Sequence, residues 1–259
     1  MSGLLLALDV GNTTILMGLF NGCSLIKDWR FFTRKEQTSD EIGWKVLTAL
    51  QSLHIESKSV KGAIISCVVP SLSDRLKEMC RNYLSCDPLE IKPGLEEYFP
   101  VSYPEPGEIG ADRIVNAVAG YEKYGSPLII VDFGTATTFC AISDKGEFMG
   151  GCIVPGIGIS LDALIENAER LTHVAWAKPG CIIAKNTDDA IRAGLFFGYA
   201  SLVNGIVKKM KKEIGGSVKV VATGGWASVI TEEAKCIDKI DPYLTLEGLR
   251  IIYEKRIKG

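Results

Sequence analysis

The sequence predicts an α/β protein of two similar domains, each a mixed sheet with helices on both faces. A near repeat is the first observation behind this prediction. LLLALDVGNTT at residues 4–14 returns as LIIVDFGTATT at residues 128–138, so Asp9 and Asp132 stand 132 − 9 = 123 residues apart. The length of 259 residues, which exceeds the usual size of one domain, is the second.

The first half of the chain reads as strands followed by alternating helices and strands. Apolar runs and helical spacings predict strands at 4–8, 14–20 and 24–33, a helix over 38–53, a strand at 62–69 and a helix over 71–84. Asn21-Gly22 is the expected hairpin turn, and Ser39 is the expected N-cap of the first helix. Residues 86–110 are rich in Pro and Gly, which predicts a long loop.

From Asp112 onward the same order of elements returns. The patterns predict a helix over 112–124, strands at 128–131, 138–143 and 148–155, helices over 161–171 and 188–214, a strand at 218–222, a helix over 226–234 and a closing helix over 246–257. Thr187 is the expected N-cap of the long helix. The repeat predicts duplication, with domains at residues 1–112 and 113–259.

Composition restricts the class of partner and the compartment. The net charge of −2 favours neither a nucleic acid nor an anionic membrane as a partner. The eight cysteines form no C-x-x-C pair, which disfavours a zinc site and favours free thiols in a reducing compartment. Asp9 interrupts the first apolar run early, so the N-terminus resembles neither a signal peptide nor a membrane span. We expect a cytoplasmic protein.

The first copy of the repeated motif has the parts of a phosphate-binding loop. Gly11 allows the backbone to approach a phosphate closely, and the hydroxyls of Thr13 and Thr14 can donate to its oxygens. Asp9, at a strand end, can hold Mg²⁺ directly or through water. A tight hairpin with a capping Asp would explain one copy alone. Two copies in matching contexts favour a nucleotide held by both.

The second copy, Asp132 to Thr138, repeats the carboxylate and the glycine turn, with Thr135 in the place of Asn12. A buried carboxylate without a partner is unfavourable, so Asp132 is expected to face a cation or a network of donors. Gly224-Gly225 follows a predicted strand, where it would either allow a base and ribose to lie on the backbone or make a simple turn.

Gly110-Ala-Asp-Arg113 opens a helix after the Pro-rich loop. Asp112 there can complement the helix dipole, but the cation of Arg113 is unfavourable in a first turn. Arg113 therefore suggests an anionic group that needs a fork of donors. By contrast, Thr187 with the acidic residues that follow it is explained fully as the start of a helix.

Five motifs in this order, DVGNTT, GADR, DFGTATT, GGCIVPG and KNT, closely resemble the type III pantothenate kinases, and the likeness covers essentially the whole chain. The paired Asp-x-Gly strands also resemble the wider superfamily of actin, hexokinases and heat-shock chaperone ATPases. The resemblance implies two ribonuclease-H-like domains of the actin-like ATPase type that flank an ATP cleft. It implies phosphorylation of pantothenate by ATP, the first step of coenzyme A synthesis.

The resemblance also implies a role for individual residues. Asp112 would be the general base, Asp132 would bind a monovalent cation (potassium or ammonium), and Asp9 would hold Mg²⁺. The implied ATP-binding residues are Asp9, Val10, Gly11, Asn12, Thr13, Thr14, Ile15, Leu16 and Thr135. The implied pantothenate-binding residues are Tyr103, Gly110, Ala111, Asp112, Arg113 and Thr187. A homodimer, whose substrate pocket the partner subunit completes, is implied as well.

Two other functions remain open on the sequence. Another small-molecule kinase of the superfamily would keep the ATP site and use residues 103–113 for a different alcohol. A nucleotide-binding regulatory factor without transferase activity is the second, and the presence of Asp9, Asp112 and Asp132 together argues against it.

Overall fold

The computed structural model describes residues 3–92, 99–167 and 174–258 of the chain. The chain divides into two compact units, Met1–Ala119 with Tyr243–Gly259, and Gly120–Pro242. The first unit is therefore built from both ends of the chain. We describe each unit by itself.

The first unit contains a five-stranded mixed sheet in the order β3-β2-β1-β4-β5. Its strands are β1 (Leu4–Val10), β2 (Thr14–Asn21), β3 (Ser24–Phe32), β4 (Val60–Cys67) and β5 (Leu89–Ile91). The β1–β2 and β2–β3 pairs are antiparallel, whereas β4 runs parallel to both β1 and β5. β1 is the central strand, with Asp9 one residue before its end.

The second unit repeats this topology. Its sheet has the order β10-β9-β6-β7-β8, with β6 (Leu128–Phe133), β7 (Ala136–Ile142), β8 (Phe148–Pro155), β9 (Lys219–Thr223) and β10 (Lys239–Ile240). The β6–β7 and β7–β8 pairs are antiparallel, and β9 is parallel to β6 and to β10. Read from the opposite edge, the order matches the first sheet strand for strand, which confirms the predicted pair of similar mixed sheets.

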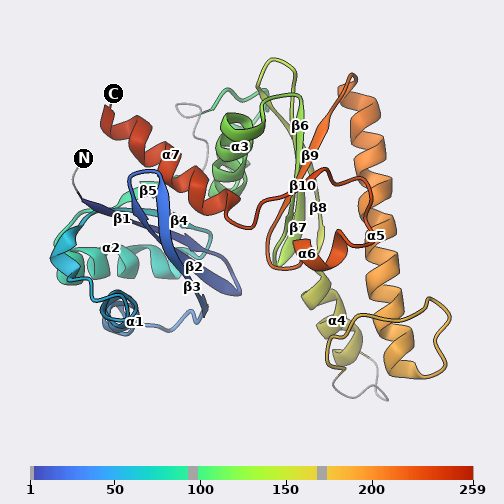
Figure 1. Ribbon diagram of the computed structural model, residues 1–259, viewed down its shortest axis with the longest axis horizontal. Coiled ribbons are helices and arrows are strands. Elements are labelled where there is room, and N and C mark those ends of the chain that lie inside the picture. The colour runs from blue at the N-terminus through green and yellow to red at the C-terminus, as the bar shows by residue number, and fades with distance from the viewer. Residues whose placement is uncertain (1–2, 93–98, 168–173, 259) are drawn as a thin grey trace. The chain divides into compact units, whose positions relative to one another are not determined.

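Helices α1 (Ser39–Gln51) and α2 (Pro70–Leu84) cover one face of the first sheet, and α7 (Leu244–Lys258) contacts the strands β1, β2 and β4 (Figure 1). The α1/α2 face has an apolar core to which Leu6, Leu8 and Val10 of β1 contribute. Because side chains alternate along a strand, Leu5, Ala7 and Asp9 point to the other face.

The cap of α1 differs from the prediction. Thr38, and not Ser39, is the N-cap: its hydroxyl accepts the N–H of Glu41, while the Glu41 carboxylate accepts the N–H of Thr38. This reciprocal pair is a capping box, and the T-x-x-E spacing that marks it was present in the sequence.

The second unit packs α5 (Thr187–Ile214) and the short α6 (Ala227–Ile230) against one face of its sheet, and α4 (Ile157–Glu166) against α5 and β7. The N-cap of α5 is Asn186, whose side-chain oxygen accepts the N–H of Asp189 at 2.9 Å, so the expected Thr187 cap was wrong. The predicted helix over 161–171 begins earlier, and its last residues lie outside the described part of the chain.

Helix α5 is long and apolar enough to cross a membrane by length and composition alone, which is weak evidence for a span. Its buried residues, among them Phe196, Val203 and Val207, belong to the core of the second unit. Core packing therefore accounts for the apolar character of its inner face.

Within the predicted loop of residues 86–110, the structure contains β5 and the 3₁₀ helix η2 (Pro106–Glu108), and residues 93–98 lie outside the described residues. Another 3₁₀ turn, η1 (Ser57–Ser59), precedes β4. Helix α3 (Ala111–Tyr124) follows the loop, and the boundary between the compact units falls within it, after Ala119. The sequence-based division assigned α7 to the second domain by chain order, whereas its contacts place it in the first unit.

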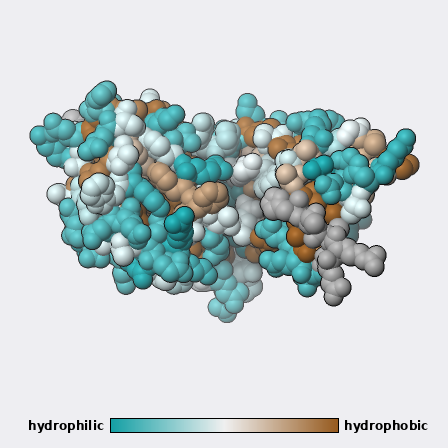
Figure 2. Space-filling model, turned by 90° about the horizontal axis from the view of Figure 1, so that it is seen from below, coloured by the Kyte–Doolittle hydropathy of each residue, from teal (hydrophilic) through white to brown (hydrophobic). Residues whose placement is uncertain are grey.

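The surface in Figure 2 is mainly hydrophilic, with hydrophobic residues in small separate areas. Trp44 and Ile183 are among the most exposed large apolar side chains. Scattered apolar residues of this kind are ordinary on a protein surface. None of the eight cysteines forms a disulfide.

Candidate functional site

The β1–β2 hairpin holds Asp9 at the carboxyl end of the central strand of the first sheet, where it is half-buried. The N–H of Gly11 donates to the carbonyl oxygen of Thr14 at 3.0 Å. The hydroxyl of Thr33, in the segment after β3, donates to the carbonyl oxygen of Gly11 at 2.7 Å. These bonds fix the loop and leave residues 12–13 exposed.

The side chains of the predicted ATP-binding segment divide into two groups. Val10 and Ile15 are buried in the core below the sheet, so only their backbone groups can contact a nucleotide. Asn12 and Thr13 are exposed, and Thr14 is half-buried. The side-chain polar groups able to bind phosphate therefore come from the tip of the hairpin and from Thr14 at the start of β2.

The two hairpins differ in register. In the first, Asp9 lies opposite Leu16, seven residues on, whereas in the second Asp132 lies opposite Thr138, six residues on. The loop between the strands is accordingly one residue shorter in the second hairpin. A slip of one residue reverses which side chains of the partner strand share a face with the aspartate.

As a result, the two aspartates have different neighbours along their sheets. Asp132 is flanked in register by Thr138 and Thr223, both buried, so three oxygen-bearing side chains stand in one row. Asp9 is flanked by Leu16 and Ser66. Oxygen donors of this kind suit a hard cation.

Two glycines allow the backbone to approach the second hairpin. Gly224 has a φ of +92°, and a Cβ there would lie 2.5 Å from Oδ1 of Asp132. A Cβ on Gly156 would lie 2.2 Å from the carbonyl oxygen of Thr135, which accepts the Gly156 N–H at 3.0 Å. Any side chain at position 224 would displace the carboxylate of Asp132. Gly224, which the sequence analysis selected, therefore leaves the space that this carboxylate occupies.

Asp112 occupies the second position of helix α3, two residues after Gly110. The Gly110 carbonyl oxygen accepts the N–H of Arg113 at 3.1 Å, and a Cβ on Gly110 would lie 2.5 Å from Oδ1 of Asp112. The carboxylate thus folds back over the glycine. Burial raises the pKa of Asp112, although the backbone N–H and the guanidinium of Arg113 oppose the shift. A carboxyl group with a raised pKa is a better proton acceptor when ionised.

The remaining predicted residues are placed as follows. Tyr103 is half-buried ahead of η2, and Ala111 is buried at the first position of α3. Thr187 is exposed at the first position of α5. Asp9, Tyr103 and Asp112 belong to the first compact unit, and Asp132, Thr135 and Thr187 belong to the second.

Ser66 is a residue that the sequence analysis did not select. Its side chain is fully buried, and its Oγ has no hydrogen-bond partner among the residues that the structure describes. It lies in register with Asp9, at the carboxyl end of β4. A polar residue inside the apolar run of residues 62–69 was the available signal, because parallel strands bring their carboxyl ends to one edge.

Other surface features do not coincide with these residues. Two hollows, both lined in part by Lys58, lie beside α1 and at the start of β1, away from Asp9 at its end. Within residues 3–92, 99–167 and 174–258, no group of three or more His, Cys, Asp or Glu side chains is arranged to hold a metal ion.

Known proteins resemble this chain along most of its length. The family described as type III pantothenate kinase matches residues 5–209. A type III pantothenate kinase of Syntrophus aciditrophicus is 49% identical over 252 residues, covering 97% of this chain and 99% of that protein. That of Myxococcus xanthus is 48% identical over 250 residues, covering 96% and 98%.

Among solved structures, a Baf family transcriptional activator from Campylobacter jejuni has a TM-score of 0.60 at 18% identity, covering 98% of this chain and 100% of that one. Component A of the (R)-2-hydroxyglutaryl-CoA dehydratase of Acidaminococcus fermentans has a TM-score of 0.56 at 15% identity, covering 96% and 95%. At these identities the likeness concerns the fold alone.

Ser66→Ala is expected to increase the free energy of unfolding by about 1 kcal/mol, because it removes a buried hydroxyl that lacks a partner. Thr137→Val is the matched control: Thr137 is also buried, but its hydroxyl lies 2.8 Å from the Tyr199 hydroxyl, so its loss should destabilise. Denaturant unfolding measures both. A destabilised Ser66→Ala variant would show that Ser66 has a partner.

Asp112→Asn is expected to raise the melting temperature at neutral pH. The raised pKa means that the folded state keeps a proton which the unfolded state has already lost, so stability falls as pH rises through that window. The neutral amide removes this penalty, and the gain should vanish as the pH falls below about 4. Asp188→Asn, at the equivalent second position of α5 but exposed, should show no such gain.

Proposed function

The chain belongs to the type III pantothenate kinase family, and we propose that it transfers the γ-phosphoryl group of ATP to the primary hydroxyl of pantothenate. This reaction is the first step of coenzyme A synthesis. Identity of 48–49% over nearly the full length of both relatives supports the substrate, since it spans both units. The placement of Asp112 is the observation that carries the mechanism.

Asp112 is the proposed general base. Its carboxylate takes the proton of the pantothenate hydroxyl as that oxygen forms a bond to the γ-phosphorus, while the bond to the bridging oxygen breaks and ADP leaves. Desolvation raises the pKa of Asp112, which increases the basicity of the ionised form. The fold of the carboxylate over Gly110 limits where the proton can be taken.

Arg113 is the proposed partner of an anion. Its guanidinium suits the carboxylate of pantothenate as a bidentate donor, and it also acts on Asp112 by lowering its pKa. Both roles require a cation in the first turn of α3, where the helix dipole disfavours it. Tyr103, Gly110, Ala111 and Thr187 are proposed to contact the rest of pantothenate.

The two hairpins are proposed to bind ATP, the first through the segment from Asp9 to Leu16 and the second through Thr135. The exposed tip at residues 12–13 supports phosphate binding by backbone N–H and hydroxyl groups. Gly134 leaves the backbone beside Thr135 free of a side chain.

Asp9 is the proposed Mg²⁺ residue and Asp132 the proposed residue for potassium or ammonium. When bound, these cations offset the negative charge of the phosphates. The row of Thr138, Asp132 and Thr223 supplies several oxygen donors, which suits a monovalent ion. Of the two residues in register with Asp9, Ser66 offers a hydroxyl, and water and phosphate would supply most of the coordination of Mg²⁺.

We also propose a homodimer and a cytoplasmic location. Helix α5 exposes Gly194, Gly198 and Gly205, and none of these has other atoms near the position of a Cβ. A helix face with so little side chain can accept close packing by a second copy. The eight free cysteines agree with a reducing compartment.

If the protein were another small-molecule kinase of the superfamily, the residues above would keep their roles and only the acceptor alcohol would differ. The relatives favour pantothenate, because they match 96–97% of this chain and are named type III pantothenate kinases. A regulatory factor without catalysis would have no need of a desolvated Asp112. A panel of small alcohols with labelled ATP separates these readings: phosphate transfer to pantothenate alone supports the proposal, and transfer to another alcohol or to none contradicts it.

Asp112→Asn is expected to lower kcat by about 10²–10⁴-fold, because an amide cannot accept the proton. The assay follows formation of 4'-phosphopantothenate from ATP and pantothenate. Asp74→Asn, which removes an exposed carboxylate on α2 of the same unit, serves as the control and should keep full activity. Turnover near normal in Asp112→Asn would remove the base assignment.

Activity is expected to rise when sodium is replaced by potassium or ammonium, and Asp132→Asn should need a higher potassium concentration for half-maximal activation. Loss of the carboxylate weakens the cation site while the two threonines remain. Asp144→Asn, in the exposed turn between β7 and β8, is the matched control in the same unit. A parent enzyme indifferent to the monovalent ion would refute this role of Asp132.

A further inference from the structure

The C-terminal helix α7 packs on the face of the first sheet that carries Asp9. Gly18 of β2 lies opposite Ala7 of β1, and a Cβ on Gly18 would lie 2.8 Å from Leu246 of α7. Leu246 and Leu249 are fully buried. Ala7 and Asp9 share this face, because they are two residues apart on one strand. Helix α7 is therefore seated beside the strand end that holds Asp9.

The same helix is in backbone contact with α3, which carries Asp112. A Cβ on Gly248 would lie only 2.2 Å from the carbonyl oxygen of Val115, so only glycine fits there. Beside this contact, the Thr245 hydroxyl donates to Oδ1 of Asn116 at 2.7 Å. Asn116 is 2% exposed and Thr245 is 8% exposed, so water does not compete for the bond.

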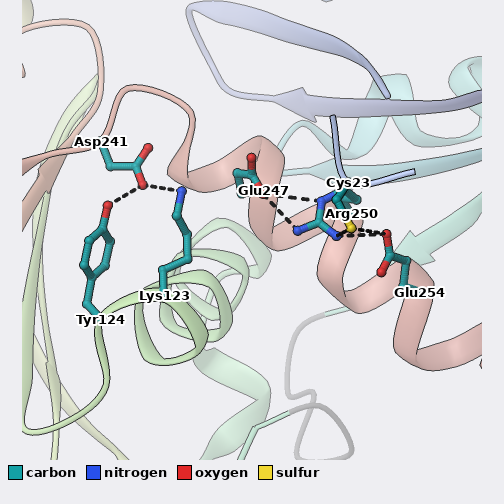
Figure 3. A network of polar contacts seen from close by, with 7 residues as sticks. All are labelled: Cys23, Lys123, Tyr124, Asp241, Glu247, Arg250 and Glu254. Atoms are coloured by element: carbon teal, nitrogen blue, oxygen red, sulfur yellow. Dashed lines mark hydrogen bonds and ion pairs between the residues drawn. The ribbon is translucent and has the colours of Figure 1, made fainter. Parts of the chain in front are cut away.

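A further set of contacts joins side chains within α7 and reaches the β2–β3 turn. Figure 3 shows the Arg250 guanidinium between Glu247 and Glu254 and beside Cys23 in the β2–β3 turn. The nitrogen–oxygen distances are 3.0 Å to Glu247 and 2.8 Å to Glu254, and Sγ of Cys23 lies 3.6 Å away. Arg250 is mostly buried, which makes these ion pairs less sensitive to salt than surface pairs.

We propose that Asn116 and Thr245 are positioning residues, which hold Asp112 in place relative to Asp9 through α7. Asn116 lies four residues after Asp112, one turn further along the same face of α3. The bond to Thr245 therefore sets the position of the turn from which Asp112 projects. This inference rests on the proposed role of Asp112 as general base.

The size of the effect follows from the demands of phosphoryl transfer. The reaction depends on positioning, and a displacement of about 1 Å far from the chemistry can lower the rate about 10²-fold. Helix α7 lies outside residues 5–209, where the family match is found, so that match assigns it no role.

The test compares three variants of the full chain. Thr245→Val keeps the shape of the side chain and removes the donor, and it is expected to lower kcat about tenfold with an unchanged KM for ATP. Thr245→Ser keeps the donor and should restore kcat. Tyr83→Phe removes a hydrogen bond between α2 and Asp40 of α1, in the same unit but on the opposite face, and should lower the melting temperature without a change in kcat.

Several outcomes would overturn the inference. One is a normal kcat in Thr245→Val. The others are a loss of kcat in Thr245→Ser, or in Tyr83→Phe, as large as the loss in Thr245→Val. Should Thr245→Val not fold, Asn116→Ser, which shortens the acceptor, takes its place with the same expected split between kcat and KM. A normal kcat in Asp112→Asn would instead refute the proposed role of Asp112 as general base, and a defect confined to Asp112→Asn would refute the positioning role alone.

Discussion

Hydrogen bonding on both sides of a central strand is the constraint on which the rest of this protein depends. β1 is paired with β2 and β4, and β6 with β7 and β9, so neither strand can slide without breaking two ladders. A slip of one residue would also turn each aspartate from one face of its sheet to the other. Backbone pairing on both sides therefore fixes the positions of Asp9 and Asp132 within their sheets.

The two sheets share one topology but prepare different chemistry. A shift of one residue in the second hairpin places Thr138 opposite Asp132, where the first hairpin places Leu16 opposite Asp9. Duplication of a fold thus does not require duplication of a site. The oxygen-rich row beside Asp132 and the sparser surroundings of Asp9 agree with two cations of different kinds.

Polar groups are buried at some loss of stability around the candidate site. Desolvation raises the pKa of Asp112, and the hydroxyl of Ser66 has no partner among the described residues. Elsewhere in the described part of the chain, buried side-chain polar atoms have partners: the Tyr199 hydroxyl reaches both Thr137 and the carbonyl oxygen of Pro155. In the second unit, Asp241 similarly accepts from Lys123 and Tyr124 (Figure 3). Buried polar groups of this kind are often found at functional sites.

The sequence alone determined the repeated strands, the aspartates near their ends, the glycine turns and the helix whose first turn contains Asp112, because each depends on residues close together in the chain. Tertiary structure decided that α7 returns to the first unit, that Ser66 stands beside Asp9, and that Thr245 meets Asn116 across 129 residues. Short edge strands such as β10 were also invisible locally, since two residues carry no periodicity. Contacts between distant segments follow from how whole elements pack, and no local pattern encodes them.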